Sequence, residues 1–502
     1  MSDITTQTLD AIKAVYAGDA ELRKAASNTV NIASGLLAFD LQAPAKQLYP
    51  VNTPLVAATP RAGGGTGSAT NWRQITAITG SGYDSMGWVP EGVRAGAMSL
   101  TTATKAASYT TIGEEEQVTF EAQSGAQGFE DILSTSAIRL LQKMRQKEEN
   151  AILGGNASLA LGTTPTATSS ASGSGATLPT LTYDLGVVAM TYEGYRNWLA
   201  NGASIVTGLT QTRTINSQDG STFNLNGGYA QKSAVATQAV TIGQTLFVAV
   251  APVTGAYAYA WYIGGAGASR LEKVTPLATT TFTAALAGTG QTFASLTASD
   301  VSRNTSAFDG FLSNVAQGLG GYYVALANGV TGVGTPLTTS GRGSVTEIDT
   351  MFQTMWDNFQ VSPTVLYVNS KELKTITNLV LGNTSSAPLV RFNNDGSGGR
   401  LEVQGGGVVR SYFNPFSTNG GYEIPVRVHP FLPPGTIFGY CEKLPEFYQS
   451  SNVPNTAEVK TRRDYYQIMW PLVTRAYQTG VYSEEVLAIY APFALGVITN
   501  IQ

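Results

Sequence analysis

The chain has 502 residues and a net charge of −4, and its length exceeds what one compact core usually supports, so we expect two or more domains. Charged residues are only 13% against roughly 25% in an average soluble domain, while 43% are hydrophobic, which excludes a disordered chain. The lack of a basic block excludes sequence-specific nucleic-acid binding, and the low charge indicates a folded protein covered by neighbours or exposed outside a cell.

The N-terminal part predicts helices followed by an extended arm. Between positions 3 and 39 apolar residues recur loosely at steps of three and four, at Ile4, Leu9, Ile12, Val15 and Leu22. No basic start precedes an apolar core, so a secretory signal is not expected. From Pro44 to Gly67, four prolines and the Gly63–Gly67 run predict an arm without a core of its own, which must lie on something else.

A long two-stranded excursion is predicted next. Asn71 to Ile78 forms one strand and Met98 to Glu121 a second extended stretch, with the tip near Trp88 and Pro90. An isolated hairpin of this kind is marginally stable in water, so a neighbour is again required.

The clearest single element is a long helix predicted from Gly128 to Asn150. One apolar stripe carries Phe129, Ile132, Leu133, Ala137, Leu140, Met144, Ala151 and Ile152. The other faces are polar and include Glu149, and Gly154-Gly155 supplies the C-terminal stop. One face should therefore pack on a sheet while the other meets solvent or a partner.

A low-complexity linker is predicted from Gly162 to Pro179, and short strands follow it. These strands, with a hairpin turn at Asp219-Gly220 and Trp261 in the core, predict a β-sandwich. The expected strands are Leu185–Tyr192, Gln238–Ala251, Ala256–Ile263, Arg270–Val274 and Thr279–Ala285.

Helices and strands alternate again from Asp309, which predicts an α+β body around the inserted all-β module. Helices are expected over Val345–Asn358 and Lys371–Leu379. Strands are expected at Thr364–Val368, Leu401–Val403, Val408–Phe413, Val426–His429 and Gly435–Cys441, with the C-terminal region almost continuous strand.

We find no catalytic, cofactor-binding or metal site in the sequence. His429 is the single histidine and has no serine or cysteine motif near it, so we expect a structural role. Cys441 is the single cysteine, which excludes a CxxC metal site. Glu114-Glu115-Glu116 is interpreted as a solvated or partner-facing strand end, since neighbours in a strand point to opposite faces. Asp219-Gly220 and Asn394-Asp395-Gly396 are interpreted as turns, because neither has the spacing of an EF-hand.

Three stretches, taken in order, resemble the major capsid proteins of tailed bacteriophages. They are GFEDILSTSAIRLLQKMRQKEENAILGGN after the arm and hairpin, IDTMFQTMWDNFQVSPTVLYVNSKELKTI, and RVHPFLPPGTIFGYCEKLP with TRRDYYQIMWPLVTRAYQTGVYSEEVLAIYAP. They are similar to that family's spine helix, its central A-domain, and the closing strands of its A- and P-domains. The region from Leu181 to Leu296 departs from the minimal family fold and resembles an inserted immunoglobulin-like domain.

The resemblance implies a non-enzymatic capsid protein that assembles with itself into pentamers and hexamers of an icosahedral head around double-stranded DNA, without a membrane. It implies a portal and possibly scaffold or decoration proteins as partners, and a virion location after assembly in the host cytoplasm. In some members a lysine and an asparagine of neighbouring subunits crosslink, and Lys105 is the candidate donor in the hairpin. The implied division is 1–70 N-terminal helix and arm, 71–122 E-loop and P-domain strands, 123–160 spine helix, 161–180 linker, 181–305 inserted domain, 306–440 A-domain, and 441–502 C-terminal strands.

Other readings stay open. An encapsulin-type nanocompartment has the same fold, although the inserted module and long arm argue against it. An adhesin or tail protein would be built around repeated sandwiches, and the sequence shows one.

Overall fold

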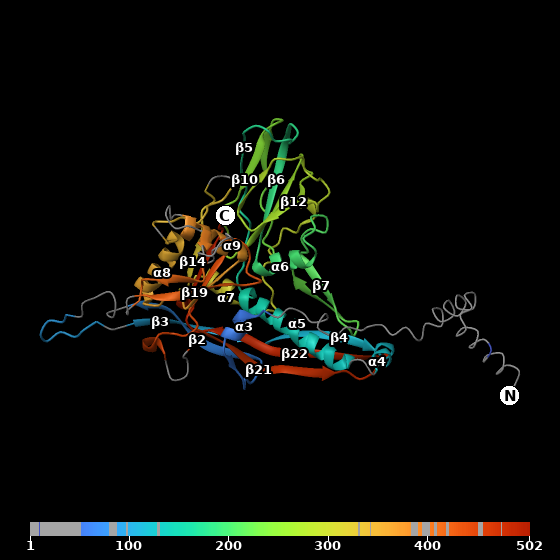
Figure 1. The fold of residues 1–502 in the computed structure, drawn as a ribbon, viewed down its shortest axis with the longest axis vertical. Coiled ribbons are helices and arrows are strands. Elements are labelled where there is room, and N and C mark those ends of the chain that lie inside the picture. The colour runs from blue at the N-terminus through green and yellow to red at the C-terminus, as the bar shows by residue number, and fades with distance from the viewer. Residues whose placement is uncertain are drawn as a thin grey trace.

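The computed structural model describes Asp10 and residues 52–79, 88–96, 99–127, 131–329, 332–341, 343–382, 390–393, 402–405, 409–417, 421–449, 455–472 and 474–502. Figure 1 shows a long sheet with a helix on one face, a β module standing above it, a mixed α/β body beside the module, and a projecting hairpin. The helices expected between residues 3 and 39 lie outside the described residues, except that Asp10 is helical and exposed.

The long sheet has the strand order β1-β21-β22-β4. Its strands are Arg61–Ala62, Ala457–Met469, Ala476–Ile489 and Thr110–Thr119. β1 runs parallel to β21, and the other neighbours are antiparallel. The sheet therefore joins the C-terminal strands to segments from the first quarter of the chain.

Helix α5 (Ile132–Gly154) lies on this sheet, where Leu140 and Met144 pack with Val481 of β22. The short helix α4 (Phe120–Ala126) precedes it. At 23 residues, α5 is ~35 Å long. The predicted helix is confirmed from Ile132 onward and runs four residues beyond Asn150, while residues 128–130 lie outside the described part.

Glu149 was placed on a face expected to meet solvent or a partner, and the structure instead buries it within the chain. Both Glu148 and Glu149 are completely buried. One face of the helix carries Leu140, Met144 and Glu148, because they follow one another at steps of four residues. Glu148 therefore belongs to the buried face, although it is not apolar like the other two.

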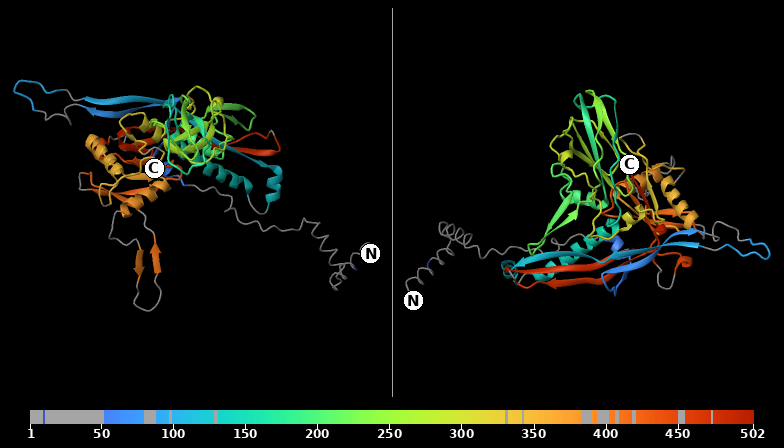
Figure 2. Two further views of the ribbon diagram at one scale, coloured as in Figure 1. Left: turned by 90° about the horizontal axis from the view of Figure 1, so that it is seen from above. Right: turned by 180° about the vertical axis from the view of Figure 1, so that it is seen from behind.

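The hairpin consists of β2 (Ala69–Thr79) and β3 (Ser99–Ser108), which confirms the predicted two-stranded excursion. The second extended stretch, expected to run unbroken to Glu121, instead divides at Tyr109: β3 stays in the hairpin and β4 enters the long sheet. In Figures 1 and 2 the hairpin extends away from the body beyond the end of the long sheet.

The β module contains two sheets that enclose a core around Trp261, which is fully buried as predicted. One sheet has the order β13-β10-β5, with bounds Thr279–Phe282, Thr245–Ala249 and Thr168–Ser172. The other has the order β12-β11-β6-β9, with bounds Arg270–Thr275, Ala258–Gly264, Leu181–Met190 and Ala236–Val240. The module also holds α6 (Tyr192–Ala200), the hairpin β7–β8 (Thr212–Asn216, Thr222–Asn226) and a 3-10 turn, η3 (Phe293–Ser295).

Three details of the module correct the sequence interpretation. The expected linker contains β5, which pairs with β10 at the edge of its sheet, and a fully buried Leu178. The expected strand Gln238–Ala251 is broken into β9 and β10 by a turn in which Gly243 has φ 92°. Tyr192 opens helix α6 instead of ending a strand, since the Thr191 side chain caps the helix by accepting from Gly194 N–H.

The mixed body is a six-stranded sheet with the order β14-β23-β20-β15-β19-β18. These strands are Tyr322–Ala325, Leu495–Thr499, Ile437–Tyr440, Val365–Val368, Tyr422–Val428 and Ser411–Asn414. The body also carries α7 (Phe311–Ala316), α8 (Thr346–Phe359), α9 (Ser370–Gly382) and the pair β16–β17 (Val390–Asn393, Glu402–Gly405), with 3-10 turns η4 (Glu446–Tyr448) and η5 (Pro492–Ala494). The predicted helices at 345–358 and 371–379 are therefore confirmed to within a few residues.

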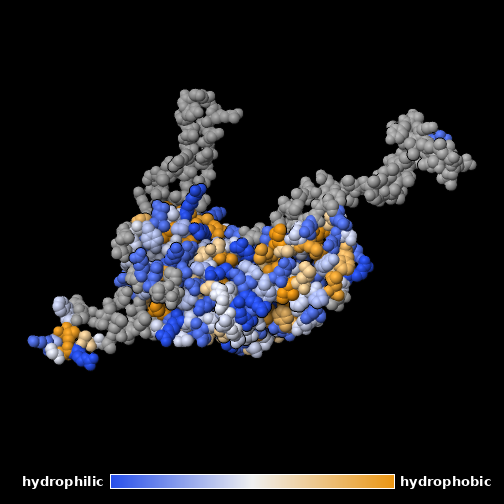
Figure 3. All heavy atoms as spheres, turned by 90° about the horizontal axis from the view of Figure 1, so that it is seen from below, coloured by the Kyte–Doolittle hydropathy of each residue, from blue (hydrophilic) through white to orange (hydrophobic). Residues whose placement is uncertain are grey.

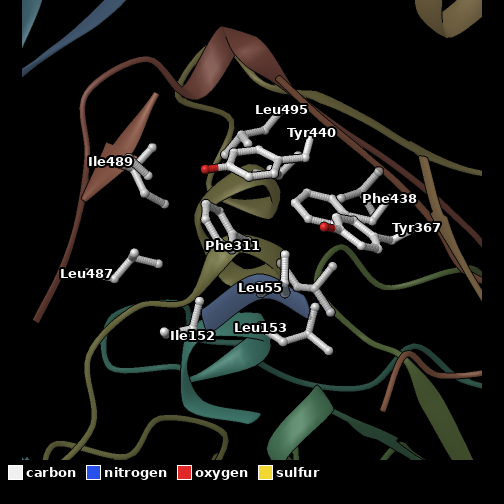
Figure 4. Close-up of a cluster of buried hydrophobic side chains, with 14 of the residues drawn as sticks. Leu55, Ile152, Leu153, Phe311, Tyr367, Phe438, Tyr440, Leu487, Ile489 and Leu495 are labelled. Atoms are coloured by element: carbon white, nitrogen blue, oxygen red, sulfur yellow. The ribbon is translucent and has the colours of Figure 1, made fainter. Parts of the chain in front are cut away.

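One apolar core joins these parts at the C-terminal end of α5. Figure 4 shows Ile152 and Leu153 of α5, Phe311 of α7, and side chains from the six-stranded and long sheets pointing toward one another. Leu55 belongs to the same cluster and comes from α3 (Pro54–Ala58). The arm was predicted to have no core of its own, and this part of it is held by the core of the rest of the chain.

Candidate assembly surface

Hydrogen bonds fix the hairpin β2–β3 to the body near its base, among the residues that the structure describes. Ile75 N–H donates to the Tyr490 carbonyl at 3.1 Å, and the side chains of Trp72 and Gln74 donate to the Ile489 carbonyl at 2.9 and 2.8 Å. These bonds orient the hairpin relative to the end of β22. Along the described residues, β2 and β3 pair with each other and with no further strand.

The tip of the hairpin is apolar and exposed. Trp88 is 87% exposed, Val93 is 59% exposed, and Val89 is also exposed. The view from below shows apolar surface at this tip and again at the opposite end of the body (Figure 3). A strand edge without a neighbouring strand can pair with another chain, and an exposed apolar patch is typical of an interaction site.

Glu149 fastens the arm to the long helix. Its carboxylate accepts hydrogen bonds from Leu55 N–H at 2.9 Å and Val56 N–H at 2.8 Å, and it lies 2.7 Å from His429 Nε2. His429 Nδ1 accepts from Phe431 N–H at 3.2 Å, so the proton lies on Nε2 and is donated to Glu149. His429 is buried, and through Glu149 it ties the end of β19 to α5 and α3.

Glu148 makes a second junction, on the side of the long sheet. It pairs with Arg61 of β1 and accepts from the Tyr465 hydroxyl, while Arg61 also reaches Glu485 at 3.1 Å and Asp464 at 2.5 Å. Burial, and then the neighbouring Glu148 carboxylate, raises the pKa of Glu485 to about 7. One guanidinium thus pairs with two completely buried carboxyl groups where the arm enters the sheet.

The three glutamates of β4 were expected at a solvated or partner-facing strand end; they are partly exposed, and each also has a partner within the chain. Glu114 pairs with Lys147 and Glu116 with Arg139, both of α5, while Glu115 accepts from the Tyr482 hydroxyl. The predicted alternation of faces is confirmed. What the sequence could not show is that α5 returns over this face of β4.

The turn after α5 holds both connections of the β module. Asn156 Nδ2 donates to the Ser302 carbonyl at 2.9 Å, and Asn304 N–H donates to the Asn156 carbonyl at 2.8 Å. The Tyr192 hydroxyl donates to Asn150 Oδ1 at 2.6 Å. The module is therefore braced against the helix and not loosely tethered.

The remaining sequence candidates have local roles. Lys105 Nζ donates to Gln317 Oε1 of the same chain at 3.2 Å. Cys441 is buried just after β20, and burial raises the pKa of its thiol to about 12. Asp219 forms the predicted turn by accepting from Ser221 N–H, whereas residues 394–396 lie outside the described part.

Two kinds of feature are absent from the described residues. No group of three or more His, Cys, Asp or Glu side chains there is placed to hold a metal ion. Among the same residues, no helix has the length and apolar character needed to cross a membrane.

Comparisons with known proteins give structural neighbours but no sequence relatives, since neither a family model nor a curated protein matches the chain. The neighbours are phage capsid proteins and encapsulins. The Mycobacterium phage Bobi structure has 9% identity and a TM-score of 0.38, over 93% of this chain and 96% of that one. The capsid of the empty GTA particle has 8% identity and a TM-score of 0.37, over 92% and 100%. The holo-SrpI encapsulin complex of Synechococcus elongatus has 9% identity and a TM-score of 0.37, over 93% and 97%. Likeness at this level decides nothing further about this chain.

Proposed function

We propose that this chain is a structural subunit that assembles with copies of itself into a closed, capsid-type shell. The observation that carries the proposal is the hairpin β2–β3. It is fixed at its base, has open edges along its strands, and ends in an 87% exposed Trp88. A two-stranded hairpin of this length is marginally stable alone, and a neighbouring copy supplies the surface that covers it.

The low charge of the chain supports the same proposal. Only 13% of the residues are charged, and charge is depleted where protein surfaces become buried in interfaces. The finer form of the proposal is the icosahedral head of a tailed phage, with pentamers and hexamers around double-stranded DNA contacted non-specifically. Its further partners would be a portal and scaffold or decoration proteins, and α5 would act as the spine helix, with the β module as an immunoglobulin-like insertion.

Electron microscopy of the purified chain tests the shell. The double variant Trp88→Ser, Val93→Ser removes the apolar tip, and Ile242→Ser is the matched control because Ile242 is 72% exposed on the β module. Losing a buried aromatic anchor costs ~2 kcal/mol or more at each interface, so the tip variant should stay as small oligomers while the wild type and control form shells. A wild type that remains monomeric at high concentration, or a tip variant that forms shells in normal yield, contradicts the proposal.

The content of the particles separates the phage head from an encapsulin-type compartment. Particles purified from the expressing cell are treated with nuclease and then opened. Protected DNA supports a genome container, and a co-purified enzyme supports a cargo compartment. An adhesin or tail protein would give neither, because it would not form closed shells.

A further inference from the structure

One cation serves three carboxyl groups where the arm joins the long sheet. Arg61 of β1 contacts Glu148 of α5, Glu485 of β22 and Asp464 of β21. Glu148 and Glu485 are completely buried, whereas Asp464 is 54% exposed. With all three carboxyl groups ionised, three negative charges would face one positive charge. Because a buried charge without a counter-charge is costly, we expect the buried pair to keep a proton.

The hydrogen bonds favour Glu485 as the site of this proton. Glu148 accepts from Arg61 with one carboxyl oxygen and from the Tyr465 hydroxyl with the other. Glu485 Oε2 accepts from Ser483 Oγ at 2.8 Å, but Glu485 Oε1 is buried and has no hydrogen-bond partner among the described residues. Burial, and then the Glu148 carboxylate, raises the pKa of Glu485 to about 7, and burial also raises the pKa of Glu148. Groups that interact this closely titrate as a pair, so a change in either glutamate changes the titration of both.

The charged and titratable groups around Glu485 include one cation that contacts both buried glutamates. On β4 the residue opposite Glu485 is the uncharged Thr110. Burial raises the pKa of Tyr465, so its hydroxyl stays protonated. The surrounding groups are Arg61 from β1, Glu148 from α5, Asp464 and Tyr465 from β21, and the Glu114–Lys147 pair between β4 and α5. The cation that contacts the pair is thus Arg61, and it belongs to the arm.

We propose that Arg61, Glu148 and Glu485 form a proton-controlled attachment of the arm: while the glutamates share a proton β1 stays on β21, and loss of that proton releases β1. β1 is otherwise weakly held, since it is two residues long and pairs with β21 alone among the described strands. Release admits water to both carboxyl groups, which lowers their pKa toward the ordinary value. A pKa that is higher in the attached state means that attachment is strongest at low pH and weakens as the pH rises through about 7. The inference concerns a single chain and does not depend on shell formation.

Hydrogen exchange in the full, unassembled chain tests this attachment at two amides. Val459 N–H donates to the Pro60 carbonyl at 2.9 Å and Gly65 N–H donates to the Thr461 carbonyl at 3.1 Å, so the protection of both amides depends on the arm lying on β21. From pH 5.5 to pH 8 their protection factors should fall about twentyfold, for a carboxyl group whose pKa is about 7 in the attached arm and 4.5 in the released arm. Both amides should also exchange faster than those of β11, because release of the arm is local and does not require global unfolding.

Two variants distinguish a shared proton from a single titrating group. Glu485→Gln and Glu148→Gln each leave Arg61 with one buried carboxyl group, so both should reduce the change between the two pH values to less than about threefold. Glu116→Gln is the matched control, because Glu116 pairs with Arg139 of α5 on the same sheet, and it should keep the twentyfold change. Slow exchange of β11 in each variant shows that the variant is folded.

Three results would overturn the proposal. The first is a wild type whose two protection factors do not change with pH, and the second is a loss of the pH dependence in Glu485→Gln but not in Glu148→Gln. The third is exchange of the two amides as slow as that of β11, which would assign the pH dependence to global unfolding.

Discussion

Glu149→Gln should release the arm from the long helix. The substitution keeps the size of the side chain but replaces one carboxylate oxygen with an NH2 group, which can only donate. Three donors converge on the carboxylate, from Leu55, Val56 and His429, and the site is completely buried. At least one of them therefore faces another donor.

The cost follows from these contacts. A buried donor left without a partner costs ~1–3 kcal/mol. The hydrogen bonds that remain also become weaker, because a bond to a charged acceptor contributes ~1.5–3 kcal/mol and a bond to a neutral one ~0.5–1.5 kcal/mol. His429 cannot relieve the conflict by moving its proton to Nδ1, because Nδ1 accepts from Phe431 N–H. We expect a loss of ~2–4 kcal/mol, which is localised at α3.

Hydrogen exchange at the amides of Leu55 and Val56 measures this loss, at a protein concentration below that of assembly. The expected increase in exchange rate is ~30- to 1000-fold, since ~1.4 kcal/mol corresponds to tenfold. Glu121→Gln is the control, because Glu121 and its partner Arg475 are 62% and 80% exposed, and such pairs contribute ~0–1 kcal/mol. An increase below about threefold in Glu149→Gln would refute the reasoning, because the three donors would then not depend on the carboxylate.

Two further predictions follow from the arm. The pKa of Glu485 is raised from 4.5 to about 7, so between these pH values the folded chain holds a proton that the unfolded chain has lost. The free energy of unfolding should therefore fall by on the order of 2 kcal/mol as the pH rises from 5 to 8. Urea unfolding should show this pH dependence and Glu485→Gln should flatten it, whereas an unchanged pH dependence in the variant would contradict the assignment. In the Gly63–Gly67 run of the arm, a Cβ on Gly65 would collide with the Tyr109 side chain, while one on Gly63 would meet Thr461 Oγ1 at 3.8 Å. Gly65→Ala should therefore lower stability by ~1–3 kcal/mol and reduce shell yield, with Gly63→Ala near wild type in thermal unfolding and microscopy, and equal behaviour of the two variants would argue against a fixed, packed arm.

Patterns within a single element were predicted well. Local periodicity and turn residues, which depend only on neighbours in the sequence, were enough to predict four features. These are the hairpin tip at Trp88, the long helix after the hairpin, the helix over 345–358 and the buried Trp261. The division into domains and the immunoglobulin-like character of the module stay predictions.

The places where prediction failed are those where distant segments meet. The sequence by itself determined the elements and the open hairpin, because periodicity and turn chemistry act over a few residues. Only the tertiary structure decided that Glu148 and Glu149 are buried, since their partners Arg61, Leu55 and His429 lie between 87 and 280 residues away. A glutamate in a helix has the same local pattern whether it meets water or a buried donor, and packing between remote segments makes that choice.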